Sequence, residues 1–167
     1  WRSFEDACTK NGTHADRANW HLVSNFYLAD TREEAWNDVR EGIMRETGYF
    51  LSIGFKPLYE SYDGQPVSEI TAESAVERRD WVVGTPEDAI DWIEKKLETN
   101  GHFGGVMLTT HEWTNAEKLR RSLELFARYV IPHFNSGRYN YRAEAKRLSE
   151  QVKVHGSVPL NVGDTSS

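Results

Sequence analysis

The sequence predicts an α/β fold in which parallel strands alternate with helices, and three observations support this prediction. Two apolar, strand-like runs, 21–28 and 103–108, are each followed by apolar residues at helical spacing. Two of the helices begin at good capping residues, Thr31 and Thr85. The later run is apolar on both faces, as strands of parallel sheets are. Repeated strand–helix units of this kind imply parallel strands joined by right-handed crossovers.

The chain opens on a segment, 1–10, that can form a helix but has neither a capping residue nor an initiator methionine. We therefore expect a processed chain or a fragment of a longer protein. The run His21–Leu28 (HLVSNFYL) is rich in aliphatic and aromatic residues and predicts a strand.

A helix is predicted immediately after this strand. Thr31 and Glu34 have the spacing of a capping box, and Asp30 with Glu33 is the alternative pair. One buried stripe is expected from apolar residues at helical spacing, namely Ala35, Val39 and Ile43. Gly48 is the expected end of the helix.

Periodicity weakens over 48–80, which we interpret as an insertion that is helical at first and looped over 68–80. A long loop inside a compact domain is usually functional, so the insertion is a candidate lid.

The stretch 81–134 predicts helix, strand, helix. Thr85, Pro86 and Asp88 are expected to start the first helix, and Gly101 to end it. Its buried stripe is predicted to be Ile90, Ile93 and Leu97. The second helix follows the strand Phe103–Leu108 and is expected to end at Pro132. Its apolar stripe is predicted to be Leu119, Leu123, Phe126 and Val130.

A last helix is possible over 141–154, and 156–167 is expected to be a frayed tail, so the predicted domain spans 1–155.

Composition excludes several classes of function. The net charge is −6 and no stretch combines basic residues with aromatic ones, so we expect no nucleic-acid partner. No run of about 18 apolar residues occurs, so we expect no membrane span. The single cysteine fits a cytoplasmic protein. No metal-binding motif is present, and we predict no metal site.

Two parallel strands leave two open edges and cannot bury both faces among so few elements. We therefore expect the missing neighbours to come from an absent part of the chain or from a second copy, which favours a homo-oligomer.

Two stretches carry a resemblance to a known family. WVVGTPEDAIDWIEKKLETNGHFGGVMLTTHEW, followed by a helix ending in FARYVIPHF, resembles the C-terminal end of luciferase-like flavin-dependent monooxygenases, in particular the limonene-monooxygenase-like branch. NWHLVSNFYLADTREEA resembles the preceding strand and helix of the same family. The resemblance implies the C-terminal part of a (β/α)8 TIM barrel, incomplete as a barrel, with 21–28 as its seventh strand and 103–108 as its eighth.

The resemblance also implies a reaction. The family uses reduced FMN, supplied by a separate NAD(P)H-dependent flavin reductase, to insert one oxygen atom from O2 into a small organic substrate. A close variant uses a deazaflavin and transfers hydride. Two other functions stay open: a non-catalytic, truncated barrel module acting in oligomerisation or assembly, and an unrelated α/β binding domain.

Active sites of such barrels lie at the C-terminal ends of the strands. His111 is the candidate catalytic residue, as a hydrogen-bonding partner of flavin or substrate or as a proton carrier. The structural alternatives for His111 are capping of the next helix and a hydrogen bond to a backbone carbonyl. Thr109, Thr110 and Trp113 are the candidate cofactor-binding residues, although alternation lets only one of the threonines face the barrel interior and Trp113 could instead pack on the last helix.

Overall fold

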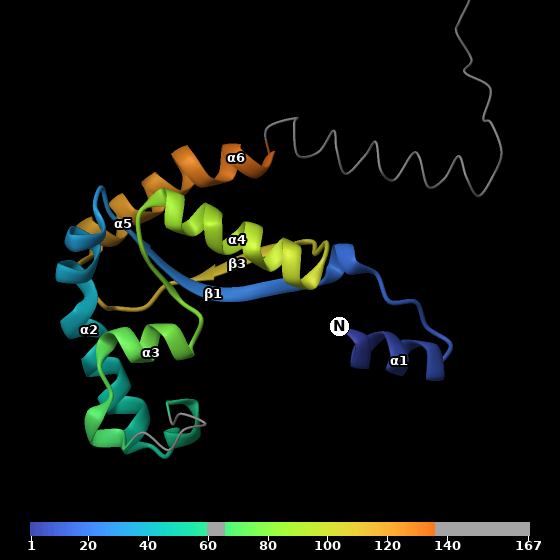
Figure 1. The fold of residues 1–167 in the computed structure, drawn as a ribbon, viewed down its shortest axis with the longest axis horizontal. Coiled ribbons are helices and arrows are strands. Elements are labelled where there is room, and N and C mark those ends of the chain that lie inside the picture. The colour runs from blue at the N-terminus through green and yellow to red at the C-terminus, as the bar shows by residue number, and fades with distance from the viewer. Residues whose placement is uncertain (60–65, 136–167) are drawn as a thin grey trace, which may run out of the picture. The chain divides into compact units, whose positions relative to one another are not determined.

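A computed structural model describes residues 1–59 and 66–135 (Figure 1). The chain divides into two units, 1–130 and 131–167. In the second unit the structure describes a short helix, α6 (Ile131–Asn135). The predicted helix at 141–154 and the predicted tail at 156–167 lie outside the described residues.

The first unit contains a parallel sheet of β1 (His21–Leu28), β2 (Val82–Gly84) and β3 (Gly105–Thr109), in the order β2-β1-β3. The first part of β1, 21–25, pairs with β3, and its last part, 26–28, pairs with β2. The two predicted strands are thus parallel neighbours, as expected. The prediction of only two strands was wrong, because β2 is a third strand. Its three residues lie directly before the Thr85 cap, and the sequence pattern does not separate them from the start of that helix.

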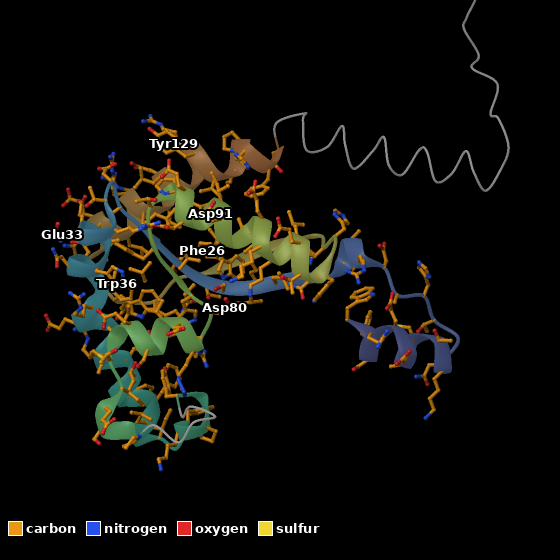
Figure 2. All side chains as sticks on the ribbon, viewed as in Figure 1. Phe26, Glu33, Trp36, Asp80, Asp91 and Tyr129 are labelled. Atoms are coloured by element: carbon orange, nitrogen blue, oxygen red, sulfur yellow. The ribbon has the colours of Figure 1, made fainter. Side chains whose placement is uncertain are left out.

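Helices cover one face of β1. They are α4 (Pro86–Asn100), α5 (Ala116–Leu125) and the π-helix Phe126–Val130. The ring of Phe26, labelled in Figure 2, lies edge-on to the rings of Trp92 and Phe126, with centroids 5.2 and 5.4 Å away. The backbone N–H of Leu28 donates to the hydroxyl of Ser122 at 2.8 Å, which ties the end of β1 to α5.

The opposite side of the sheet packs against α2 (Arg32–Ser52) and α3 (Ala72–Arg78). Figure 1 shows α4 and α3 on opposite sides of β1 and β3. The Tyr27 hydroxyl donates to Asp38 of α2 at 2.7 Å. A core forms here from buried side chains of α2, α3, the strands and the connecting segments, including Tyr27, Ala35, Val39, Ile43, Tyr59, Ile70, Ala75, Val76, Trp81 and Trp113.

The predicted helix starts are confirmed. The Thr31 hydroxyl accepts a hydrogen bond from the Glu34 N–H at the start of α2. Thr85 and Asp88 form a reciprocal capping box at the start of α4, and Gly101 ends that helix with a φ of 75°. A first helix, α1 (Arg2–Lys10), also forms as expected.

The predicted end of α2 at Gly48 was wrong, because the helix continues to Ser52. Gly48 is exposed, and a glycine within a helix costs only about 1 kcal/mol relative to alanine. The buried Thr47 beside it helps to hold the helix in place. The chain turns at Gly54, whose φ is 94°.

The second half of the predicted insertion is not looped, because α3 forms within 68–80. The helix starts at a Thr71–Ser74 capping box and buries its small apolar face, Ala72, Ala75 and Val76. Two short 3-10 helices, Lys56–Leu58 and Val67–Glu69, precede it. The described parts of the insertion therefore contribute to the core.

Other expectations about 103–134 also need correction. The predicted helix end at Pro132 was wrong, because Pro132 lies in the first turn of α6, where proline is tolerated. Leu123 was predicted to be buried and is exposed. The later strand was predicted to be buried on both faces, yet Met107 is 55% exposed, and its register partner Val23 is 61% exposed.

Candidate functional site

The candidate site lies just beyond the C-terminal end of β3. The chain leaves the strand at Thr109 and passes through His111 and Trp113 before α5 begins. Glu46 of α2 and Trp81, which immediately precedes β2, complete the cluster. The side chains therefore come from three separate parts of the chain.

Glu46 connects the two predicted site residues. Its Oε2 atom lies 2.9 Å from Nδ1 of His111 and accepts a hydrogen bond from the indole N–H of Trp113. The Glu46 side chain is 13% exposed, whereas that of His111 is 33% exposed. The imidazole is thus held on its inner side by a carboxylate and remains open to solvent elsewhere.

Sequence reasoning missed Glu46, although a signal was present. Glu46 follows Val39 by seven residues and Ile43 by three, so helical spacing places it on the buried stripe of α2. A carboxylate on a buried helix face requires polar partners. Here Trp113 donates a hydrogen bond to it, and the Nδ1 atom of His111 lies 2.9 Å away.

Aromatic rings form the walls of the cluster. The rings of Trp81 and Trp113 have centroids 4.9 Å apart, and the His111 ring stacks on Trp113 at 5.7 Å with an interplanar angle of 23°. The guanidinium of Arg79 lies 5.2 Å from the centre of the Trp81 ring. Trp113 is buried, so it contributes to the core as well as to the cluster.

The structure separates the two candidate threonines. Thr109 pairs in register with Asn25, and its hydroxyl donates to the Asn25 side-chain oxygen. Thr110 is exposed. Thr109 thus lies on the sheet face that carries Asn25, Val23 and Met107, as the alternation of side chains along a strand requires.

Two buried polar atoms near these residues have no hydrogen-bond partner among residues 1–59 and 66–135. One is the side-chain nitrogen of Asn25, a residue that is 2% exposed, and the other is Oε1 of Glu46. A buried polar atom without a partner is costly, so each is a candidate contact for a bound molecule or a water.

The N-terminus of α4 reaches the same end of the sheet but is already occupied by its own carboxylate. Asp88 accepts two hydrogen bonds from Arg32 Nε, at 2.9 and 3.0 Å, and one from the Thr85 N–H at 2.8 Å. The Arg32 hydrogen bond, together with those from Thr85, holds the pKa of Asp88 below its usual value. A negative charge therefore stays at this helix start, which disfavours binding of a phosphate there.

A charged cleft of about 460 Å³ opens at the end of β1, between α2 and α5. Asp38 accepts hydrogen bonds from Tyr27 and from Lys118, while Arg121 donates to both carboxylate oxygens of Asp30. Burial and the Asp38 carboxylate raise the pKa of Tyr27, so its hydroxyl stays protonated at neutral pH.

Two classes of site are absent from the described part of the chain. No group of three or more His, Cys, Asp or Glu side chains in it is arranged to hold a metal ion. None of its helices is both long and apolar enough to cross a bilayer.

Comparison with curated proteins gives two similar relatives, both monooxygenases. The chain is 30% identical over 155 residues to the 4-hydroxyprotoasukamycin monooxygenase of Streptomyces nodosus subsp. asukaensis, an alignment covering 92% of this chain and 41% of that protein. It is 32% identical over 135 residues to the limonene 1,2-monooxygenase of Rhodococcus erythropolis, covering 81% of this chain and 34% of the relative. Both relatives are named as monooxygenases, and the chain is similar to each over most of its own length. The resemblance predicted from the sequence is therefore confirmed, and the chain spans about two fifths or less of the length of these relatives.

Solved structures agree at the level of the fold. The oxygenating constituent of 3,6-diketocamphane monooxygenase from Pseudomonas putida, a type II Baeyer-Villiger monooxygenase solved in complex with FMN, matches with a TM-score of 0.58 and 24% identity over 79% of this chain and 38% of that one. Monooxygenase RslO1 from Streptomyces bottropensis matches with a TM-score of 0.53 and 23% identity over 78% of this chain and 36% of that one. No family model matches the sequence.

Proposed function

We propose that the chain is the C-terminal part of an FMN-dependent monooxygenase. On this proposal its strands and helices form the last part of a (β/α)8 barrel. The observation that carries this proposal is the Glu46–His111–Trp113 cluster at the C-terminal end of β3, the end at which barrel enzymes bind their substrates. The similarity to two curated monooxygenases supports the same conclusion.

The residues present fit the ring system of a flavin. A flavin offers hydrogen-bond donors and acceptors along one edge, and the unpaired Asn25 nitrogen and Glu46 Oε1 are a donor and an acceptor. The planar rings of Trp81 and Trp113 give an apolar wall of the kind that cofactor pockets use. The start of α4 is a poor site for the FMN phosphate, because Asp88 is already there.

We assign roles to the chain's own residues on this basis. Thr109 orients the Asn25 amide, and Trp113 forms part of the pocket wall. His111 binds or exchanges a proton with the bound molecules, since an imidazole is the side chain best suited to this near neutral pH. Reduced FMN, when bound, supplies the electrons with which one atom of O2 enters the substrate and the other leaves as water.

The proposed partners follow from the same assignment. They are a small organic substrate, O2 and an NAD(P)H-dependent flavin reductase, with the cytoplasm as the proposed location. Limonene is a reasonable first substrate to test, because one relative is named for its action on it. Retention of a deazaflavin instead of FMN would indicate the hydride-transfer variant.

Anaerobic titration of the chain with FMNH2, followed by flavin fluorescence, tests the proposal directly. We expect saturable binding that weakens in Trp113→Ala and in Asn25→Ala, whereas the exposed Thr110→Ala variant binds as the native chain does. Reductase-coupled oxygenation of limonene is the second assay. A native chain that is folded by circular dichroism and binds no FMNH2 would contradict the proposal.

A non-catalytic role in assembly is the second candidate, and one observation favours it. Val23 and Met107 are register partners on the same sheet face, and more than half of each side chain is exposed. Such a face is usually covered in parallel sheets. This candidate predicts a homo-oligomer by light scattering that dissociates when Met107 is replaced by Lys, whereas a monomeric native chain would argue against it.

A further inference from the structure

We infer that Glu46 is a positioning residue for His111: it holds the proton on Nδ1 and leaves Nε2 as the nitrogen that exchanges protons with a bound molecule. This inference rests on the proposed function, in which His111 is the proton-exchanging group. It concerns a residue on α2, more than sixty positions away from His111 in the sequence.

The geometry leaves one arrangement for the Nδ1 proton. Glu46 Oε2 lies 2.9 Å from His111 Nδ1, and an ionised carboxylate can only accept hydrogen bonds. This carboxylate therefore favours a proton on Nδ1, both in the neutral imidazole and in the imidazolium. The partner of one ring nitrogen selects the tautomer of a histidine. Nε2 therefore bears the lone pair in the neutral imidazole and is the nitrogen that gains and loses the second proton.

Trp113 also helps to hold Glu46 and His111 in this arrangement. Its indole N–H donates to the same Oε2 atom, and its ring stacks on the imidazole at an interplanar angle of 23°. Glu46 thus contacts the imidazole at Nδ1 and also holds, through a hydrogen bond, the ring on which the imidazole stacks. Loss of Glu46 would release both constraints together.

The carboxylate itself is anchored by the fold. Gly42, one turn before Glu46, lies against the backbone of Trp113, which places the following turn of α2 next to the 111–113 segment. Arg45 donates to the carbonyl oxygen of Glu112 at 3.1 Å and connects the two segments again. Glu46 is therefore presented to His111 by packing contacts that do not depend on a bound molecule.

Other charged or titratable groups face this cluster and define its electrostatics. Arg79 lies over Trp81 and also 5.9 Å from the ring centre of Tyr59. Burial raises the pKa of Tyr59, with Arg79 opposing that change and Glu46 adding to it. Arg45 and Glu112, the neighbouring charged residues, are exposed.

Nitrogen NMR of the chain labelled with ¹⁵N-histidine tests the inference without any cofactor. At a pH at which the imidazole is neutral, we expect His111 to give the long-range couplings of the Nδ1–H tautomer. Glu46→Gln should retain that tautomer, because the amide oxygen can accept the same bond. Glu46→Ala should lose it and give the Nε2–H form or a mixture, while the Glu41→Gln variant, altered at a residue 97% exposed on the same helix, should not change it.

Each outcome of this experiment bears on the inference. An Nε2–H tautomer in the native chain overturns it, and this measurement needs no variant to fold. An unchanged tautomer in a folded Glu46→Ala variant also overturns it. Failure of the native chain to bind FMNH2 would remove the proposed function and leave the tautomer result standing, so the two failures are distinguishable.

Discussion

Gly42 of α2 lies so close to Trp113 that a Cβ atom at residue 42 would stand 2.0 Å from the Trp113 carbonyl oxygen. Real Cβ atoms do not approach backbone atoms to that distance. Because Gly42 has no side chain, α2 can contact the segment that carries His111. The cluster depends on this contact. The whole insertion, 48–80, and β2, α4 and β3 lie between the two residues in the sequence.

Gly42→Ala is predicted to destabilise the fold by about 1–3 kcal/mol, because the added methyl group must push α2 away from Trp113. Gly48→Ala is the matched control on the same helix, since nothing lies within 4 Å of the position a Cβ would take. That control should stabilise the protein by about 0.5–1 kcal/mol through the higher helix propensity of alanine. Urea unfolding followed by circular dichroism measures both, and equal effects at the two glycines would contradict the packing argument.

Ser122→Ala is predicted to cost about 1–3 kcal/mol, because the buried Leu28 N–H would lose its acceptor. The serine lies on α5 and its bond holds the end of β1, so the loss should also loosen the charged cleft beside it. Ser3→Ala, at an exposed position of α1, should change the stability by less than about 0.5 kcal/mol. Denaturant midpoints and hydrogen exchange of the Leu28 amide report the difference, and a Ser122→Ala midpoint equal to that of Ser3→Ala would count against it.

The elements that sequence could predict are those with local signals. His21–Leu28 was predicted with its observed bounds, because eight consecutive strand-forming residues are followed at once by a helix cap. The start of α4 was equally clear, since Thr85, Pro86 and Asp88 combine cap, first-position proline and capping box. These signals act over a few residues and do not depend on the remainder of the fold.

The elements that sequence missed depend on contacts that are distant along the chain. β2 is three residues long and is a strand only because it pairs with the end of β1. α3 has a polar sequence, and its buried face consists of small residues whose partners are on α2. The candidate site shows the same division: His111 and Trp113 follow a visible strand, whereas Glu46 becomes part of the site only through the packing of α2.

Acid sensitivity is predicted at the start of α4. The folded state holds the pKa of Asp88 below its unfolded value of about 3.9, so the ionised carboxylate contributes stability above that pH and loses it as the pH falls through the lowered pKa. Asp88→Asn should therefore cost about 1 kcal/mol at neutral pH, mainly through the cap, and should flatten the loss of stability below about pH 4. Glu87→Gln removes a charge from the same helical turn without touching the capping box, and should keep the acid-side slope. Unfolding midpoints across this pH range decide the matter; identical slopes in the native chain and Asp88→Asn would exclude the assignment.

Thr109 and Thr110 offer a paired test of which sheet face binds the cofactor. Thr109 donates to the Asn25 side-chain oxygen and so fixes which atom of that amide is left to donate, whereas Thr110 is exposed. Thr109→Val keeps the shape of the side chain and removes the donor, so the Asn25 amide loses its orientation. We expect FMNH2 binding to weaken by about tenfold, the equivalent of about 1.4 kcal/mol for one hydrogen bond, with Thr110→Val unchanged. Weaker binding only in Thr110→Val would place the flavin on the other side of the strand and separate it from the face that carries Asn25.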